Sequence, residues 1–389
     1  MVVDEFKFER KELSLALATS ETTITVPHMS PEDVLKDILG KQRSFECPSQ
    51  VSELQAQFLK ILGGVLKGSI SSSDSETLNE ILNTTYQYFS RKNCDYETSL
   101  MYRTLYTDVA ITRSCCHLLQ ETINSSDDHS QSIPSLLCAI QGLDRAIVFA
   151  GTPERLDLVH QLIEALQYQY LIPKHASNGC SLDSSTSSRE PYGPTSTPVP
   201  QVRLREIFSS NLSTPFVILG AISDWPAISD PDHAWNSINY LLSVAGPGRI
   251  VPVEIGNDYR VDNWSQKMMP WEDFLHRLRT SDGVRKDEMI YLAQHSLLTQ
   301  FPRLRGDILI PDLVYFVPET REVDYKPPAS EEGLIINAWL GPKGTISPAH
   351  KVRFRCFPPS NVQRFSFSFH QDPYFNCYGK LLAPANGYQ

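Results

Sequence analysis

The sequence predicts an α+β protein, with an all-helical N-terminal half followed by a half that is rich in β-strands. Apolar residues recur at helical spacing before residue 173, whereas short β-branched runs bounded by turn residues follow residue 200. Sixteen of the twenty-seven residues from 174 to 200 are Ser, Thr, Pro or Gly, which is typical of a linker. We therefore expect a helical domain over 1–173, loosely ordered over 1–28, a linker over 174–200 and a second domain over 201–389.

The composition limits the class of protein and its compartment. The chain has 389 residues, 41% of them hydrophobic, which is enough for two domains with buried cores. Its net charge of -10 argues against direct binding of nucleic acid or of an anionic membrane. No apolar run has the length of a membrane span, the acidic N-terminus is unlike a signal peptide, and the eight cysteines lack C-x-x-C spacing. We expect reduced thiols and a location in the cytoplasm or nucleus.

The helical half contains three blocks with apolar residues at helical spacing. They run from 51 to 65, from 78 to 89 and from 137 to 148. Ser30 before Pro31, and Thr152 before Pro153, are typical of helix starts, the second preceding a run that ends near Tyr170. No 34-residue period is evident, and a helical-repeat scaffold is a weak alternative for this half.

The second half contains four short runs that predict strands. They are Phe216–Leu219, Ile250–Ile255, Met289–Leu292 and Leu334–Leu340. Two helices are expected between them, at 234–245 and 270–279. Trp225, Trp264, Trp271 and Trp339 are expected to be core aromatics.

One pair of potential metal ligands lies near the C-terminus. His370 and Asp372 are two residues apart, so on an extended strand both belong to the same face. Two His and one carboxylate form the facial triad of non-haem Fe(II) oxygenases, although an isolated H-x-D pair arises readily by chance. The other candidate, Cys115-Cys116-His117, lies in a helical run where adjacent side chains diverge, which favours a structural role.

The surrounding motifs are more specific than the pair itself. Six motifs follow one another along the chain: Pro215–Gly220, Asp224-Trp-Pro226, Val251–Gly256, Tyr291-Leu-Ala-Gln-His295, Gly344-Thr-Ile-Ser-Pro-Ala-His350 and Asp372-Pro-Tyr-Phe-Asn376. Over about residues 200–350 and 370–378 the chain resembles the JmjC-domain, cupin-like 2-oxoglutarate and Fe(II) oxygenases. Within them it is most similar to the subfamily of jumonji-domain-containing protein 5 and lysine-specific demethylase 8.

This resemblance implies a double-stranded β-helix and a set of site residues. His350 and Asp372 match the first His and the Asp that bind Fe(II), and His370 is a further candidate ligand. Tyr291, Thr345 and Asn376 match positions that contact 2-oxoglutarate; without the resemblance they are a packing residue, a turn residue and a strand-edge amide. The family acts on protein side chains, histone or other, by hydroxylation or lysine demethylation, and the resemblance favours the nucleus.

The sequence departs from the family in two places. Twenty-one residues, 351–371, separate His350 from Asp372 where the family has one. Deleting Val352–Gln371 or Lys351–His370 restores the motif, so our hypothesis is a translated intron, and the alternative is a surface loop that exposes five Phe.

The second departure follows Asn376. The remaining thirteen residues contain neither the second metal His nor the cosubstrate Lys of the family. These features predict an incomplete β-helix and an inactive chain, unless His350, His370 and Asp372 form a new metal site. The alternative function is a non-enzymatic protein-interaction module that acts through the helical domain.

Overall fold

The computed structural model describes thirteen stretches of the chain. They are residues 30–41, 48–69, 71–91, 93–123, 132–168, 201–203, 205, 217–256, 264–279, 289–311, 336–342, 362–372 and 375–384. The predicted linker over 174–200 and the loosely ordered segment 1–28 lie outside these residues. The described parts have the predicted α+β organisation, with helices first and a mainly antiparallel sheet after them.

The N-terminal region consists of α-helices and one short π-helix. Their bounds are α1 Pro31–Gly40, α2 Ser49–Val65, α3 Ser72–Phe89, α4 Tyr96–Ile123, α5 Ser132–Arg145, η1 Ala146–Ala150 and α6 Leu156–Leu166. The blocks predicted at 51–65, 78–89 and 137–148 coincide with α2, α3 and the α5–η1 pair. Helix α3 begins with a capping box, because the Ser71 and Asp74 side chains each accept from the other residue's backbone N–H.

The helix predicted after Thr152 begins later than expected. Gly151, Thr152 and Glu154 all have positive φ angles, so the backbone cannot continue as a helix there. Helix α6 therefore starts at Leu156, with Arg155 rather than Thr152 at its N-cap.

The second region contains the strands and shorter helices. Their bounds are β1 Gln201–Arg203, β2 Val217–Leu219, α8 Pro226–Ser229, α9 Ile238–Ala245, β3 Ile250–Ile255, β4 Ser265–Pro270, α10 Trp271–Arg279, β5 Ile290–His295, α11 Leu297–Gln300, η5 Pro302–Asp307, β6 Ile336–Gly341, β7 Val362–Asp372 and β8 Phe375–Pro384. Six of the strands form one sheet in the order β4-β3-β5-β6-β8-β7, in which all neighbours are antiparallel. Strands β1 and β2 pair in parallel as a separate sheet.

All four predicted strands are present, and the structure also contains strands that the sequence analysis did not predict. Strand β4 reads Ser-Gln-Lys-Met-Met-Pro, which contains no β-branched or aromatic residue, yet it pairs with β3 over six residues. Its exposed Ser265, Gln266 and Lys267 are typical of a strand at a sheet edge. Tertiary pairing with β3 thus outweighs its low β-propensity.

The segment interpreted as an intron or a surface loop contains a strand. Residues 351–361 lie outside the described part of the chain, but 362–371 belong to β7, which pairs with β8. The sequence signal was the alternation Phe365-Ser-Phe-Ser-Phe369, which has the two-residue period of a strand. The loop expectation is therefore corrected for this half of the segment.

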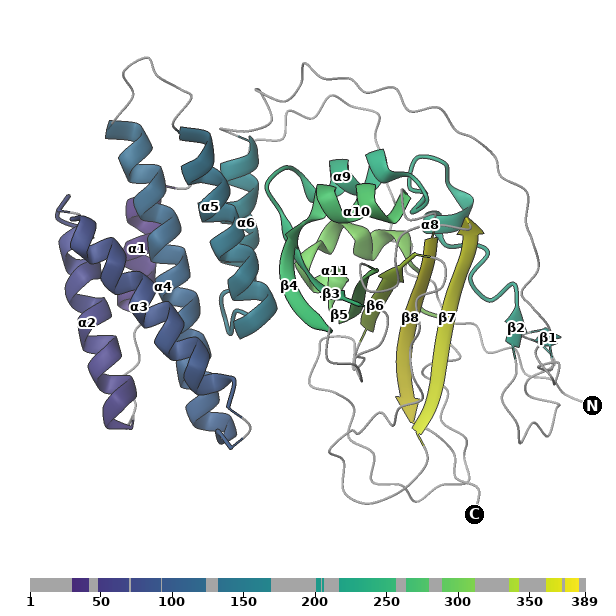
Figure 1. Ribbon diagram of the computed structural model, residues 1–389, viewed down its shortest axis with the longest axis horizontal. Helices are drawn as coiled ribbons and strands as arrows, with labels where there is room; N and C mark the ends of the chain where they lie inside the picture. The colour runs from purple at the N-terminus through teal and green to yellow at the C-terminus, as the bar shows by residue number, and fades with distance from the viewer. Residues whose placement is uncertain are drawn as a thin grey trace, which may run out of the picture.

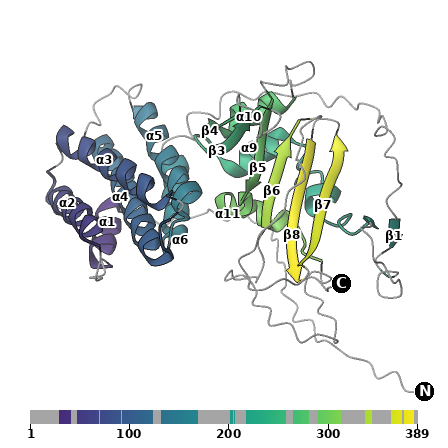
Figure 2. The same ribbon diagram turned by 60° about the horizontal axis from the view of Figure 1, so that its bottom comes forward.

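The helical and sheet regions lie side by side (Figure 1). Strands β7 and β8 are on the side of the sheet that is farther from helices α1 to α6, and the turned view agrees (Figure 2). A separate apolar core fills each region, with Phe58, Leu62 and Ile111 in the first and Trp271, Phe274 and Phe301 in the second. Among the described helices, none is both long and apolar enough to cross a membrane.

Candidate functional site

Strand β5 carries Tyr291, the best described of the predicted site residues. It pairs with β3 on one side, where Tyr291 lies opposite Glu254, and with β6 on the other. Tyr291 is 8% exposed, between the fully buried Leu292 and the buried Ile290. A hydroxyl on a buried strand is a donor that the fold holds in place, which suits recognition of a carboxylate.

The strand register brings three predicted site residues into one part of the sheet. Leu292 of β5 pairs with Leu340 of β6, Leu340 pairs with Cys377 of β8, and Cys377 pairs with Phe369 of β7. The next row toward the ends of these strands contains Tyr291, Asn376 and His370, and Asn376 and His370 pair directly. Asn376 and His370 are therefore cross-strand neighbours, whereas Gly341 of β6, the partner of Asn376, lies between Asn376 and β5.

Asp372 lies two residues beyond His370, at the end of β7. It pairs with Phe375, and the register shifts between His370 and Asp372. Such a shift changes the direction of the strand and is common beside functional sites. An imidazole, a carboxylate and an amide thus belong to adjacent positions of two paired strands, and this donor set fits the imidazole and oxygen ligands that Fe(II) takes in facial triads.

Two predicted site residues, His350 and Thr345, lie outside the described residues. Within the described part of the chain, no group of three or more His, Cys, Asp or Glu side chains is close enough to hold a metal. The Cys115-Cys116-His117 cluster lies in the helical region: both cysteines are buried in its core, and His117 Nδ1 is 2.7 Å from Ser135 Oγ. Cys94, Cys115, Cys116 and Cys138 are free thiols, as expected.

The far end of β5 is fixed by side chains that the sequence did not single out. Gln300, the last residue of α11, is fully buried, and its Oε1 lies 2.6 Å from His295 Nε2. Its Nε2 donates to the Ile250 carbonyl and to Asp144 Oδ1, both at 2.7 Å. Because both amide hydrogens are thus used, Oε1 must accept a hydrogen bond from His295 Nε2. The single N–H of a neutral imidazole, placed on Nε2, is sufficient for this bond. Burial lowers the pKa of His295, which favours this neutral form.

Asp144 belongs to α5 and reaches the sheet from the helical region. Its carboxylate accepts from Arg249 Nη2 at 2.7 Å, from Arg249 Nε at 3.0 Å and from the Ile250 backbone N–H at 2.9 Å. Arg249 Nη2 also donates to the Gln300 carbonyl, and its guanidinium lies over the Phe301 ring. A buried Arg is tolerated only with such partners, because an unpaired charge is costly to desolvate.

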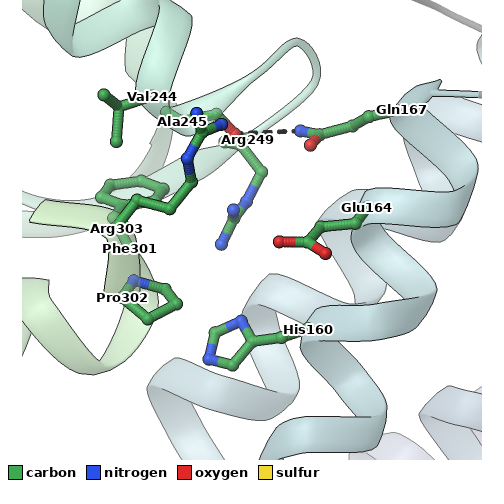
Figure 3. Close-up of a pocket in the computed structure, with 9 residues that line it drawn as sticks. All are labelled: His160, Glu164, Gln167, Val244, Ala245, Arg249, Phe301, Pro302 and Arg303. Carbon is green, nitrogen blue, oxygen red and sulfur yellow. Dashed lines mark hydrogen bonds between the residues drawn. The ribbon is translucent and has the colours of Figure 1, made fainter. Parts of the chain in front are cut away.

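A pocket lies beside this junction, between α6 and the second region (Figure 3). His160 and Glu164 of α6 and Gln167, directly after α6, line it on one side, and Arg249, Phe301 and Arg303 are among the residues that face them. Gln167 Nε2 donates to the carbonyls of Ala245 and Pro247, and His160 Nε2 donates to that of Thr299. These bonds join the two regions, whereas the predicted metal and cosubstrate residues belong to other parts of the chain.

The aromatic predictions are largely confirmed. Trp225, Trp271 and Trp339 are 3%, 1% and 6% exposed. Trp264 is half-buried instead, and its Nε1 donates to Glu254 Oε2 at 3.2 Å, so it borders the sheet rather than filling the core.

The sheet has six antiparallel strands, and candidate ligands of Fe(II) and of 2-oxoglutarate belong to its adjacent strands β7 and β8. This arrangement is expected of a cupin-like oxygenase. Residues 203–380 match the family model of the cupin-like domain. Over this segment the chain is similar to the cupin-like domain, and the relatives it resembles carry JmjC-domain names.

The chain is also similar to curated proteins with JmjC-domain and lysine-specific demethylase names. The chain is 43% identical over 137 residues to Jumonji C domain-containing protein 5 of Drosophila melanogaster, covering 35% of this chain and 31% of the relative. It is 42% identical over 137 residues to lysine-specific demethylase 8 of Danio rerio, covering 35% and 30%. The protein of that name from Xenopus tropicalis is 39% identical over 139 residues, covering 35% and 27%. The matched segment therefore spans less than a third of each relative's length.

Proposed function

We propose that the chain is a JmjC-type oxygenase that uses Fe(II) and 2-oxoglutarate to oxidise a protein side chain. The observation that carries this proposal is the common row of Tyr291, Asn376 and His370 on strands β5, β8 and β7, with β6 between the first two, in the segment that matches the cupin-like domain. Each of these positions was selected from a sequence motif, and their clustering in the sheet is independent support.

The proposed roles follow the chemistry of each side chain. His350 and Asp372 bind Fe(II), with His370 as the candidate third ligand. Tyr291, Thr345 and Asn376 donate hydrogen bonds to the carboxylates of 2-oxoglutarate, for which hydroxyl and amide groups are suited. Bound Fe(II) and 2-oxoglutarate together supply the oxidising power for O₂-dependent chemistry. Tyr291 is 8% exposed, and a hydrogen bond is stronger in such a buried environment than in water.

The proposed substrate is a side chain of a histone or another protein. Two of the three relatives above are named lysine-specific demethylases, which favours N-methyl lysine. Oxidation of an N-methyl carbon leads to loss of the methyl group, whereas oxidation of a side-chain carbon leaves a stable hydroxyl. Mass spectrometry of a product peptide separates the two outcomes. The proposed location is the nucleus or cytoplasm.

The test is 2-oxoglutarate turnover by the full chain. Succinate release is measured with Fe(II), ascorbate and a histone-peptide pool, and Asp372→Ala is expected to abolish it. His276→Ala is the matched control, because His276 is exposed on α10. Turnover that Asp372→Ala leaves unchanged would contradict the proposal. The absence of both turnover and 2-oxoglutarate binding in the unaltered chain would agree with the predicted inactivity instead.

Metal titration assigns the ligands separately. Fe(II) affinity is measured without oxygen for His350→Ala, His370→Ala and Asp372→Ala. We expect a loss of tenfold or more for His350→Ala and Asp372→Ala. An equal loss for His370→Ala identifies it as the third ligand.

A further inference from the structure

We propose that Asp144, in the helical region, is a positioning residue of the cosubstrate site. Through Gln300 it fixes the ends of β3 and β5, and β5 carries Tyr291. The assignment of Tyr291 to the cosubstrate site rests on the function proposed above. The helical region is then a structural part of the oxygenase as well as a potential partner-binding unit.

Strands β3 and β5 pair over a short stretch at one end. Their backbone register covers only two pairs, Glu254 with Tyr291 and Ile255 with Ile290. Continued in the same register, Ile250 falls opposite His295, at the other end of the pair. Between Leu292 and His295 the pairing of β5 with β6 also shifts, and Gln294 has a φ of 50°. Beyond Leu292, β5 therefore has an irregular backbone ladder on both sides.

Side chains bind the backbone of Ile250, at the start of β3, in place of a regular ladder. The Ile250 N–H donates to Asp144, and its carbonyl accepts from Gln300. Gln300 also binds His295, so one buried amide joins the first residue of β3 to the last residue of β5. These side chains satisfy backbone groups that a regular strand pair would satisfy itself.

Asp144 orients the Gln300 amide. Its Nε2 lies 2.7 Å from Asp144 Oδ1, and Arg249 holds that carboxylate through two nitrogens. All these side chains are buried, where hydrogen bonds to charged groups are strong and an unpaired group is costly. Removing the charge of Asp144 therefore weakens the bonds to Arg249, Ile250 and Gln300 together.

The helical region offers a matched control for this ion pair. Arg155 Nε donates to Asp108 Oδ1 at 3.0 Å, and the two side chains are 6% and 3% exposed. Both residues belong to the helical region, so Asp108→Asn removes an equally buried charge without touching β3 or β5. A merely structural effect predicts the same response from both variants.

The experiment measures backbone hydrogen exchange in the full chain by mass spectrometry, without added cosubstrate. We expect Asp144→Asn to accelerate exchange in peptides of β3 and β5 by about tenfold, and Asp108→Asn to accelerate it only in helical peptides. Gln300→Met removes the amide that joins Ile250 to His295 but keeps the Asp144–Arg249 pair. It should accelerate exchange in β5 as much as Asp144→Asn does. It also supplies the test if Asp144→Asn fails to fold. Unchanged protection of β5 in a folded Asp144→Asn or Gln300→Met, or equal loosening in Asp108→Asn, would overturn the proposal.

A second measurement tests whether the Asp144–Gln300 hydrogen bond affects cosubstrate binding. The dissociation constant for 2-oxoglutarate is measured by calorimetry with Fe(II) and without oxygen. We expect about tenfold weaker binding for Asp144→Asn and less than a twofold change for Asp108→Asn. If the unaltered chain binds no 2-oxoglutarate, the proposed function fails, while the exchange data still decide whether Asp144 positions β5. If β5 loosens but affinity stays unchanged, the positioning role toward the cosubstrate is overturned.

Discussion

Asp144 and Arg249 form a buried ion pair across 105 positions of the sequence, joining helix α5 to the start of strand β3. The side chains are 0% and 5% exposed, and Arg249 contacts the carboxylate through both Nε and Nη2. The fork of a guanidinium fits a carboxylate in this way, whereas an ammonium does not. The helical and sheet regions are therefore joined by charge as well as by apolar contact.

Arg249→Ala is expected to destabilise the protein severely. It leaves the Asp144 carboxylate buried without its cation, a situation that typically costs about 3–5 kcal/mol. Urea unfolding followed by circular dichroism measures the loss. Replacing both partners, as Asp144→Leu with Arg249→Met, should cost less than Arg249→Ala alone, because no buried charge remains.

The control for this prediction is an exposed ion pair. Lys36 and Asp33 are 67% and 73% exposed, so Asp33→Ala should change the unfolding free energy by about 0.5 kcal/mol or less. If Arg249→Ala costs no more than Asp33→Ala, the buried pair does not stabilise the junction.

The fold was predicted from the sequence where local patterns determine the structure. The helical periodicity of 51–65 and the β-branched run 250–255 match α2 and β3. Strand β4 was missed because its residues carry no β-signal, and it exists through its pairing with β3. Residues 362–371 belong to β7 rather than to a loop, and their Phe-Ser alternation has the two-residue period of a strand; the intron origin of the segment stays a hypothesis.

The candidate site shows the same division between local and long-range information. Motifs identified Tyr291, His370 and Asn376 individually, but their common row depends on strand register, which involves residues far apart in sequence. Asp144 and Gln300 were missed for this reason as well. A buried Arg before a strand indicates that an acidic partner exists, yet the chain has 45 acidic residues and no local signal selects one.

Gly246→Ala is expected to disrupt the junction more than a comparable glycine substitution elsewhere. Gly246 has a φ of 71°, and an added Cβ would meet the Gln167 side chain at 2.5 Å. Gln167 would have to move and give up its bonds to the Ala245 and Pro247 carbonyls. We expect a loss of about 2–3 kcal/mol in thermal or urea unfolding, from backbone strain and lost hydrogen bonds together.

Gly220→Ala separates these two causes. Gly220 has a φ of 72°, but an added Cβ would meet only Ser223 Oγ, at 3.9 Å. It should therefore cost about 1 kcal/mol, from strain alone. Equal losses for Gly220→Ala and Gly246→Ala would show that the contact with Gln167 contributes nothing.

Acid is expected to destabilise the fold through its buried histidines. Burial lowers the pKa of His117, His160 and His295. An unfolded histidine therefore binds a proton below about pH 6.5 while the folded one stays neutral, so the unfolding free energy falls as the pH falls from 7. In urea titrations at successive pH values, His295→Gln should reduce this slope by up to about 1.4 kcal/mol per pH unit. Leu297→Ala destabilises the same segment without removing an ionisable group, and should leave the slope unchanged.

Asp307 is expected to be essential for the packing of η5 against α9. Its buried carboxylate accepts from Trp235 Nε1 at 2.8 Å, from the Tyr240 hydroxyl at 2.6 Å and from His233 Nδ1 at 2.8 Å. Burial, together with the bond to Asp307, raises the pKa of Tyr240, so its hydroxyl stays protonated and continues to donate.

Asp307→Ala removes the common acceptor and leaves the buried indole N–H and the phenol without it. We expect a loss of about 3 kcal/mol or more, because each bond to a charged group contributes about 1.5–3 kcal/mol. Tyr240→Phe removes one donor and should cost less, and Asp232→Ala, at an exposed position nearby, should cost about 0.5 kcal/mol or less. Urea unfolding compares the three variants, with tryptophan fluorescence reporting changes around Trp235. A loss for Asp307→Ala that does not exceed the loss for Tyr240→Phe would mean that the carboxylate is not the centre of this cluster.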